Sequence, residues 1–216
     1  QAVKMPSSMS FEHGACLGIP GLTAAQLICM QSNIEEKTIF ISGGNGAVGH
    51  LAIQLAKYRG AQIIATARAG KVKKLKDLGA DFVLDYADPE LDKKVLECVP
   101  NGVDYAVEVE FGENINIIPK IMRAMGTVSI YGSGKNMNPK FPFGEYLFKS
   151  LTLNVILVYI MPMPVRKRLI KIIHDAYINN ALSPSIDSIY ELGDCAKAHE
   201  QVMKPGRNGT VLLKID

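Results

Sequence analysis

Cysteine is scarce in this 216-residue sequence, and no two cysteines form a recognisable motif. The four cysteines are scattered and none has C-x-x-C spacing, so they predict neither a zinc site nor a disulfide framework. Isolated reduced thiols are typical of the cytosol, and a cytoplasmic location is therefore expected.

Long apolar runs and a strong charge of one sign are also absent. The most apolar stretch, residues 151–160, has about half the roughly 20 residues that a membrane helix needs. It is rich in β-branched residues and predicts a buried strand. The net charge of +3 is too small to indicate a nucleic acid or a membrane surface as partner. With 48% hydrophobic and 21% charged residues, the composition is that of a soluble globular protein.

The most informative feature that is present is a glycine-rich turn. Residues 39–50 read as a short apolar strand, a turn in G-x-G-x-x-G spacing, and the start of a helix. The first glycines let bare backbone approach a pyrophosphate, the last lets the helix pack on its strand, and the helix N-terminus offers free N–H groups. A plain loop is the alternative, but the order strand, turn, helix favours a dinucleotide site at Gly44, Asn45, Gly46, Ala47 and Val48.

The absence of an acidic residue after the glycine turn narrows the choice between NAD and NADP. NAD-binding units carry an acidic residue near the end of the next strand, here residues 62–67, where it holds the ribose 2′-hydroxyl. This sequence has no acidic residue between Glu36 and Asp77, and it has Arg68 and Lys71 instead. Basic groups suit the 2′-phosphate of NADP, so NADP (NADPH) is predicted over NAD. The other lysines of the following helix are expected to face solvent: Lys73, Lys74 and Lys76.

Strands and helices alternate along most of the chain. Strands are predicted at residues 39–41, 62–67, 81–85, 103–109, 127–131 and 151–158, with helices at 51–59, 71–78, 89–98 and 115–125. This alternation predicts an α/β fold with a doubly wound parallel (Rossmann) sheet. After the amphipathic helix that Pro164 opens, a strand at 188–192, a helix at 194–203 and a strand at 210–215 have no obvious place in that sheet. They resemble a piece of a second domain.

Five segments match one protein family, in that family's order: residues 14–25, 43–57, 78–86, 126–132 and 196–201. On these segments the chain resembles the NADPH:quinone oxidoreductase (zeta-crystallin-like), zinc-independent branch of the medium-chain dehydrogenase/reductase superfamily. The resemblance implies two domains, with a GroES-like catalytic domain preceding the cofactor domain and the substrate cleft between them. It assigns residues 11–180 to an NADP-binding Rossmann domain, and 1–10 and 181–216 to a remnant of the GroES-like domain of a longer protein.

The same resemblance implies cofactor contacts. Lys71 and Tyr86 match a lysine and a tyrosine on the adenosine 2′-phosphate, although Tyr86 has simple packing as its alternative. Thr23 matches a helix start that meets the nicotinamide ribose. The strand ends that line the nicotinamide pocket are matched by Val109, Tyr131, Gly132 and Ser133.

Two departures from related patterns are visible. Residues 110–112 read Glu-Phe-Gly where the family usually has V-G-G. Zinc alcohol dehydrogenases take a cysteine ligand four residues before the threonine matching Thr23, and here that residue is Ile19, which cannot bind a metal. No zinc and no other metal is therefore expected.

Together these features predict a zinc-independent, NADPH-dependent oxidoreductase that transfers hydride to a quinone or a similar electron-poor carbonyl acceptor. Two alternatives stay open: an enone or enoyl-thioester reductase of the same superfamily, and a non-catalytic NADPH-binding protein of the crystallin-like or RNA-binding kind. Catalytic residues are not assigned. A homodimer through the last sheet strand, residues 151–158, is expected, with neither a nucleic acid nor a membrane as partner.

Overall fold

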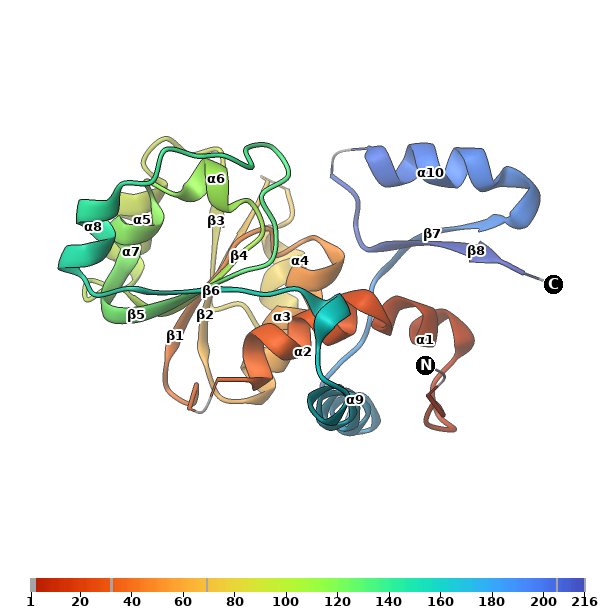
Figure 1. Ribbon diagram of the computed structural model, residues 1–216. Helices are drawn as coiled ribbons and strands as arrows, with labels where there is room; N and C mark the ends of the chain where they lie inside the picture. Colours follow the sequence, from red (N-terminus) through yellow and green to blue (C-terminus); the bar gives the residue numbers. More distant parts are fainter. Residues whose placement is uncertain (1–2, 32, 69, 205, 216) are drawn as a thin grey trace.

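The computed structural model describes residues 3–31, 33–68, 70–204 and 206–215. Its main part is a six-stranded parallel sheet of order β3-β2-β1-β4-β5-β6, the order of doubly wound dinucleotide-binding folds (Figure 1). The α/β prediction is thereby confirmed. The strands are β1 (Thr38–Ile41), β2 (Gln62–Ala67), β3 (Phe82–Asp85), β4 (Val103–Glu108), β5 (Met122–Ile130) and β6 (Thr152–Val155).

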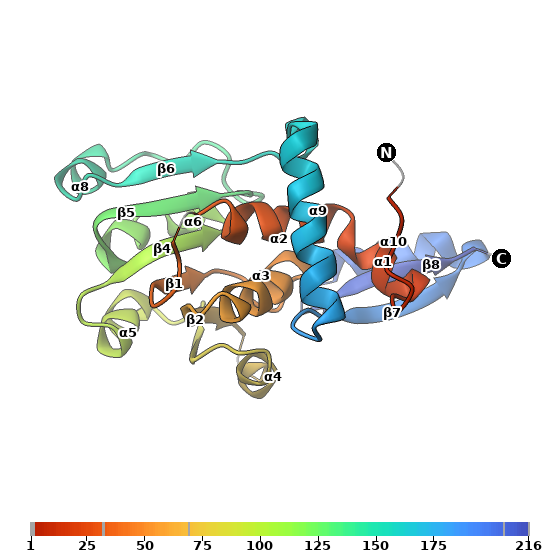
Figure 2. The same cartoon turned by 90° about the horizontal axis from the view of Figure 1, so that it is seen from below.

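Helices cover both faces of this sheet, and alternate strand residues serve the two sides. In β1, Ile39 and Ile41 join the buried cluster with α2, α3 and α9, while Phe40 joins the opposite cluster with α5 and α7 (Figures 1 and 2). The helices up to this point are α1 (Phe11–Leu17), α2 (Ile19–Cys29), α3 (Ala47–Tyr58), α4 (Val72–Asp77), α5 (Leu91–Cys98), α6 (Phe111–Asn114), α7 (Ile118–Ile121), α8 (Phe143–Phe148), the 3-10 helix η1 (Val158–Ile160) and α9 (Met163–Ile178).

The C-terminal segment forms a two-stranded sheet of its own, and with its helices it is called the C-terminal unit below. The strands β7 (Ile186–Glu191) and β8 (Thr210–Lys214) pair in parallel, joined by the short η2 (Leu192–Asp194) and by α10 (Cys195–Met203). Figure 1 shows this unit beside α1 and away from the six-stranded sheet. Helix α1, in which Cys16 is buried, lies against β8.

Three sequence-based boundaries need correction. The helix expected at 115–125 is shorter than predicted: α7 covers Ile118–Ile121, and β5 already begins at Met122, which is buried and pairs with Val103. A register shift then brings Thr127 opposite Tyr105, so one strand absorbs residues that the helical pattern had claimed. The helix expected from residue 51 begins at Ala47, since Gly46 has extended backbone angles and is its N-cap.

The last sheet strand also differs from its prediction. A buried strand is expected at 151–158, but β6 is shorter and all four of its residues are exposed, because it lies at the edge of the sheet. The chain then turns into η1. Among the helices described, none is both long and apolar enough to cross a membrane.

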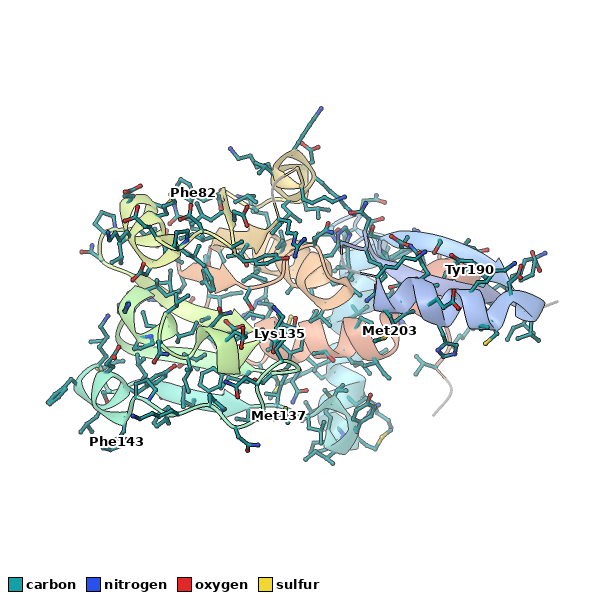
Figure 3. The ribbon with its side chains drawn as sticks, turned by 90° about the horizontal axis from the view of Figure 1, so that it is seen from above. Phe82, Lys135, Met137, Phe143, Tyr190 and Met203 are labelled. Carbon is teal, nitrogen blue, oxygen red and sulfur yellow. The ribbon has the colours of Figure 1, made fainter. Side chains whose placement is uncertain are left out.

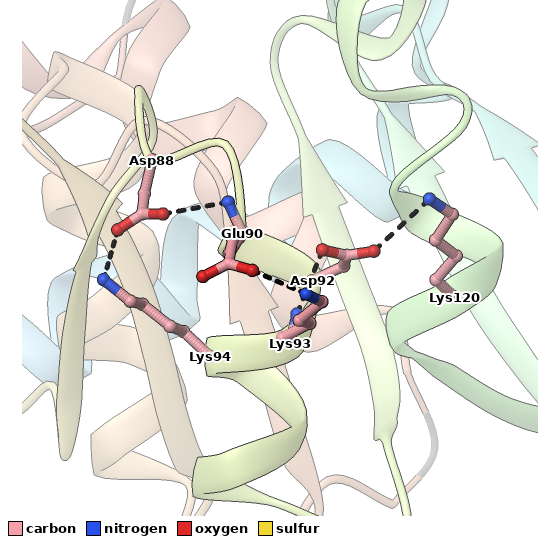
Figure 4. A network of polar contacts seen from close by, with 6 residues as sticks. All are labelled: Asp88, Glu90, Asp92, Lys93, Lys94 and Lys120. Carbon is pink, nitrogen blue, oxygen red and sulfur yellow. Dashed lines mark hydrogen bonds and ion pairs between the residues drawn. The ribbon is translucent and has the colours of Figure 1, made fainter.

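An exposed network of charged side chains follows β3. Figure 4 shows Asp88 paired with Lys94, Glu90 with Lys93, and Asp92 with Lys120, which joins α5 to α7. Solvent screens exposed pairs of this kind, so each contributes little to stability.

Candidate functional site

The glycine turn lies where the sheet order reverses, between β1 and β4. Gly43 has a φ of +66°, a conformation that favours glycine, and Gly46 N–H donates to Gly43 O at 3.0 Å to close the turn. Thr66 of β2 fixes the turn from the side, because its Oγ1 accepts from Gly43 N–H at 3.1 Å and its carbonyl from Gly44 N–H at 2.8 Å. The free N-terminus of α3 starts directly after it.

The motif glycines are required by close approach. A Cβ on Gly49 would lie 2.3 Å from Gly43 O, and a Cβ on Gly44 would lie 3.0 Å from side chains of both Ile53 and Leu75. The third glycine of the motif therefore lets α3 pack against the turn, as its spacing predicts. The turn has the local geometry of a pyrophosphate-binding loop, with Gly44, Asn45, Gly46, Ala47 and Val48 on it.

Basic and aromatic side chains meet at the ends of β2 and β3. Arg68 follows β2, and its Nε donates a short hydrogen bond to the Tyr86 hydroxyl, while its guanidinium carbon lies 5.8 Å from the centroid of that ring. Arg68 and Tyr86 are both exposed, and Lys71 is the N-cap residue of α4, its N–H donating to Arg68 O at 3.3 Å. The structure thus brings together the three residues predicted for the 2′-phosphate.

One lysine of α4 does not face solvent. Lys73 and Lys76 are exposed, as expected, but Lys74 is half-buried and its Nζ lies 3.0 Å from both Ser185 Oγ and Asn208 O. Burial first, and then the charge of Lys71, lower the pKa of Lys74. The prediction of a solvent-facing Lys74 is therefore wrong, because residues more than 100 positions away fold back onto it.

The strand ends predicted for the nicotinamide lie on the other side of the glycine turn. A Cβ on Gly132 would lie 2.5 Å from Val109 O, so glycine is what allows the ends of β4 and β5 to come together. Val109 N–H donates to Ser42 Oγ at 2.9 Å, and a Cβ on Gly43 would touch Cγ1 of Val109 at 3.0 Å. The Val109 backbone is therefore tied to the end of β1.

A buried carboxyl group lies beneath this region, and the sequence analysis missed it. Glu108 is 0% exposed, and its Oε1 accepts from Ser42 Oγ at 2.7 Å, Glu110 N–H at 2.7 Å and Asn114 Nδ2 at 3.0 Å. Its Oε2 is buried without a partner in the described part of the chain. Burial raises the pKa of Glu108, against the opposing effect of its hydrogen bonds. The sequence did carry a signal for Glu108, because an acidic residue stands at the end of a mostly apolar strand.

The departure at residues 110–112 has a structural role. Gly112 N–H donates to Ser133 Oγ at 2.8 Å, and a Cβ on Gly112 would lie 2.0 Å from Asn136 O. Glu110 Oε1 accepts from Lys135 N–H at 2.7 Å. These contacts join the loops after β4 and β5, so Glu110 holds the segment containing Ser133 in place.

Two further residues complete the predicted set. Thr23 is buried on α2, and its hydroxyl donates to Ile19 O at 2.8 Å, inside its own helix. Tyr131 follows β5 and is half-buried, with Lys135 exposed in the same loop (labelled in Figure 3). Tyr131 and Lys135 have Tyr-x-x-x-Lys spacing, but they lie in an irregular loop, where this spacing does not place two side chains on one face. We assign them no catalytic role.

The donor atoms for a metal ion are not gathered at this site. Over residues 3–31, 33–68, 70–204 and 206–215, no three side chains of His, Cys, Asp or Glu are grouped to hold one. Cys16 is buried and burial raises the pKa of its thiol, and the side chain of Ile19 has no atom that can bind a metal.

The strand order, the glycine turn at its reversal point and the helix N-terminus define the class of protein: one with a Rossmann-type dinucleotide-binding domain. The family model for zinc-binding dehydrogenases matches residues 47–175. The chain therefore belongs to this family, within the medium-chain dehydrogenase/reductase superfamily, and is similar to its quinone oxidoreductases.

Individual relatives agree with that assignment. A chloroplast envelope quinone oxidoreductase homolog of Arabidopsis thaliana is 33% identical over 159 residues, covering 63% of this chain and 48% of the relative. A trans-enoyl reductase of Alternaria alternata is 37% identical over 108 residues, covering 46% of this chain and 31% of the relative. A mycobacterial protein solved in complex with NADPH shares the fold, with a TM-score of 0.89 and 24% identity over 98% of this chain and 67% of that one.

The chain spans less than two thirds of the length of the first curated relatives that it matches, for example 62% of one and 64% of another.

Proposed function

We propose that the protein is an NADPH-dependent oxidoreductase that transfers hydride to a quinone or a similar electron-poor carbonyl compound. One observation supports the choice of cofactor: Arg68 contacts Tyr86 with its side chain and Lys71 through the backbone, and no acidic residue occurs between residues 36 and 77. A carboxylate there would repel a 2′-phosphate, whereas cations attract it.

Each part of the site has a role in this proposal. The N–H groups of the turn and of the first turn of α3 bind the pyrophosphate. Arg68 and Lys71 supply positive charge to the 2′-phosphate, and the Tyr86 hydroxyl, which accepts from Arg68, has its own proton free to donate. The strand ends orient the ring: Val109, Tyr131, Gly132 and Ser133. NADPH, when bound, supplies the hydride, and the protein supplies its position.

The proposed acceptor does not require a zinc ion. Reduction of a quinone gives an aromatic product whose oxygens can take protons from water, so a strong Lewis acid is not needed. The similarity to quinone oxidoreductase relatives supports this class of acceptor. The similarity to a trans-enoyl reductase favours an enone or enoyl-thioester as the second candidate. A binding protein without turnover is the remaining alternative.

The test is a titration of the full chain with NADPH and with NADH, followed by nicotinamide fluorescence. We expect NADPH to bind at least about tenfold more tightly than NADH, equivalent to roughly 1.4 kcal/mol. In the double variant Arg68→Ala with Lys71→Ala, we expect NADPH affinity to fall by about tenfold or more and NADH affinity to change little, because only NADPH carries the 2′-phosphate.

Lys73→Ala is the matched control, since Lys73 is an exposed lysine of the same helix. Equal losses for both cofactors in the double variant would remove the 2′-phosphate assignment. Turnover of a panel of quinones and enones by the full-length protein then separates the two reductase candidates, and absence of turnover with tight binding favours the binding protein.

The division of the chain into domains and the location of the protein in the cell are part of the same proposal. We assign residues 11–180 to the cofactor domain, and 1–10 with 181–216 to the remnant of a catalytic domain. Separate hydrogen bonding of β7 and β8 supports this boundary. A cytoplasmic location, without a nucleic-acid or membrane partner, agrees with the small net charge and with free thiols in the described residues.

We also propose a homodimer in which the β6 strands of two copies pair. β6 is one of the two edge strands of the sheet, and its apolar Leu153 and Val155 are 37% and 77% exposed. An exposed apolar edge strand otherwise invites aggregation. Sedimentation should give a dimer mass for the wild type and a monomer mass for Val155→Lys, while Val3→Lys, an exposed apolar position elsewhere, should leave the dimer intact. A wild-type monomer would contradict the pairing.

A further inference from the structure

The C-terminal unit is hydrogen-bonded directly to the glycine turn. Asn45, in the middle of the turn, donates from Nδ2 to Arg207 O at 2.6 Å and to Asn208 Oδ1 at 3.1 Å. These partners are more than 160 residues away in sequence. A residue expected to face the cofactor therefore already has its amide bound by a distant loop.

Lys74 holds the same loop from its other side. Its Nζ donates to Asn208 O and to Ser185 Oγ, both at 3.0 Å, and Ser185 Oγ itself donates to Asn208 O. Asn208 N–H donates to Asp187 Oδ1 at 2.8 Å, which fixes the loop to β7. Asn208 is thus held on three sides, by the turn, by α4 and by its own sheet.

Two residues of α3, the helix that follows the turn, also contact the C-terminal segment. His50 Nε2 lies 2.9 Å from Ser183 O, and Gln54 both donates to Ser183 O at 3.1 Å and accepts from Ser183 N–H at 2.8 Å. His50 and Gln54 are buried. We call the whole set the C-terminal junction: Asn45, His50, Gln54, Lys74, Ser183, Ser185, Arg207 and Asn208.

We infer that the C-terminal junction fixes the shape of the glycine turn, and that Lys74 is a positioning residue for the pyrophosphate of either dinucleotide. The inference rests on the proposed function, in which this turn binds a dinucleotide. Lys74 acts through Asn208 and Asn45, whereas Arg68 and Lys71 are assigned to the 2′-phosphate itself.

This division of roles predicts two different kinds of change in binding. The pyrophosphate is common to NADH and NADPH, so a loosened turn weakens both cofactors by the same factor. The 2′-phosphate occurs only in NADPH, so loss of Arg68 and Lys71 changes the ratio of the two affinities. The ratio therefore separates positioning of the turn from direct contact with the phosphate.

The experiment titrates the full chain and its Lys74→Met variant with NADPH and with NADH. Methionine keeps the length of the side chain and removes the charged donor. We expect both dissociation constants to rise by about tenfold, with their ratio unchanged, because charge-assisted hydrogen bonds to a loop backbone and a hydroxyl are lost. Lys73→Met, an exposed lysine of the same helix, should bind both cofactors like the wild type, and Lys74→Arg, which keeps donors, should recover most of the affinity.

A second variant guards against misfolding of the first. Asn208→Ala removes the oxygen that accepts from Asn45 and should weaken both cofactors by about threefold. Hydrogen exchange provides an independent readout: NADPH should slow exchange of the Thr210 N–H, which is bonded to Ser185 O at 2.8 Å, in the wild type and much less in Lys74→Met.

The possible results are distinct. Wild-type affinities in both Lys74→Met and Asn208→Ala would overturn the inference and leave the proposed function intact. A selective loss of NADPH in Lys74→Met would also overturn it, because Lys74 would then be a 2′-phosphate contact. If the wild type and Lys73→Met bind neither cofactor, the proposed function itself fails, and the inference fails with it.

Discussion

The two ends of the proposed cofactor site are built from opposite kinds of side chain. At the ends of β2 and β3, Arg68 and Tyr86 are exposed and contact each other at the surface. At the ends of β4 and β1, Glu108 is completely buried and accepts three hydrogen bonds. The first end is basic and solvated, and the second is acidic and closed.

We expect this difference to separate residues that select the cofactor from residues that stabilise the fold. An exposed cation costs little to hold and can meet a phosphate when the cofactor arrives. A buried carboxyl group with several donors organises the backbone around it, and removing it leaves those donors unpaired. Substitutions at the basic end should therefore change binding, and substitutions at the acidic end should change folding.

The largest effect is expected from Glu108→Ala. The Ser42 hydroxyl, Glu110 N–H and the Asn114 amide would lose their shared acceptor inside the protein, so the free energy of unfolding should fall by about 3 kcal/mol or more. Denaturant unfolding measures this directly. Glu108→Gln keeps one oxygen acceptor and should cost clearly less, and equal costs for the two variants would show that the hydrogen bonds are unimportant.

The pH dependence of the stability of the wild type and of Glu108→Gln tests the charge state of Glu108. Because the native pKa of Glu108 is raised above its unfolded value of 4.5, the native state keeps the proton to higher pH than the unfolded chain does. Stability from this group is thus full below pH 4.5 and falls as pH rises through the native pKa, by up to about 1.4 kcal/mol per pH unit. The stability advantage of the wild type over Glu108→Gln should shrink accordingly. An advantage that grows with pH would contradict the raised pKa.

The smallest effect is expected from Tyr86→Phe. This ring is 44% exposed, so loss of its hydroxyl should change the free energy of unfolding by less than about 0.5 kcal/mol. The affinity for NADPH should fall by about threefold, with NADH unaffected, because one hydrogen bond to the 2′-phosphate is lost. Titrations with NADPH and NADH measure the change in affinity, and melting curves measure the change in stability. A large loss of stability with unchanged binding would make Tyr86 a packing residue.

Much of the glycine turn was predictable from sequence because its geometry depends on residues that are close together in the chain. A glycine is needed wherever a Cβ would collide with backbone, and Gly49 meets this condition against Gly43, six residues away. Alternation of strands and short helices likewise predicts a parallel, doubly wound sheet through handedness rules. The basic end was predictable for the same reason, since Arg68 and Lys71 follow directly from the end of a strand.

The errors have a common physical cause. Met122 lies in an apparently helical pattern, but pairing with Val103 takes it into the sheet. The stretch 151–158 is apolar enough for a core strand, yet its place at the sheet edge leaves β6 exposed. Sheet pairing and edge position depend on partners far along the chain, which local periodicity does not encode.

The sequence by itself determined the dinucleotide-binding class of the fold and the positions of the turn and the basic strand end, because each depends on neighbours within a few residues. Only the tertiary structure decided that Lys74 points inward, that Asn45 is bonded to Asn208, and that Glu108 is bonded to Ser42. Those arrangements join segments from 66 to 163 residues apart. Their energies arise from burial and from hydrogen-bond partners that exist only once the chain has folded.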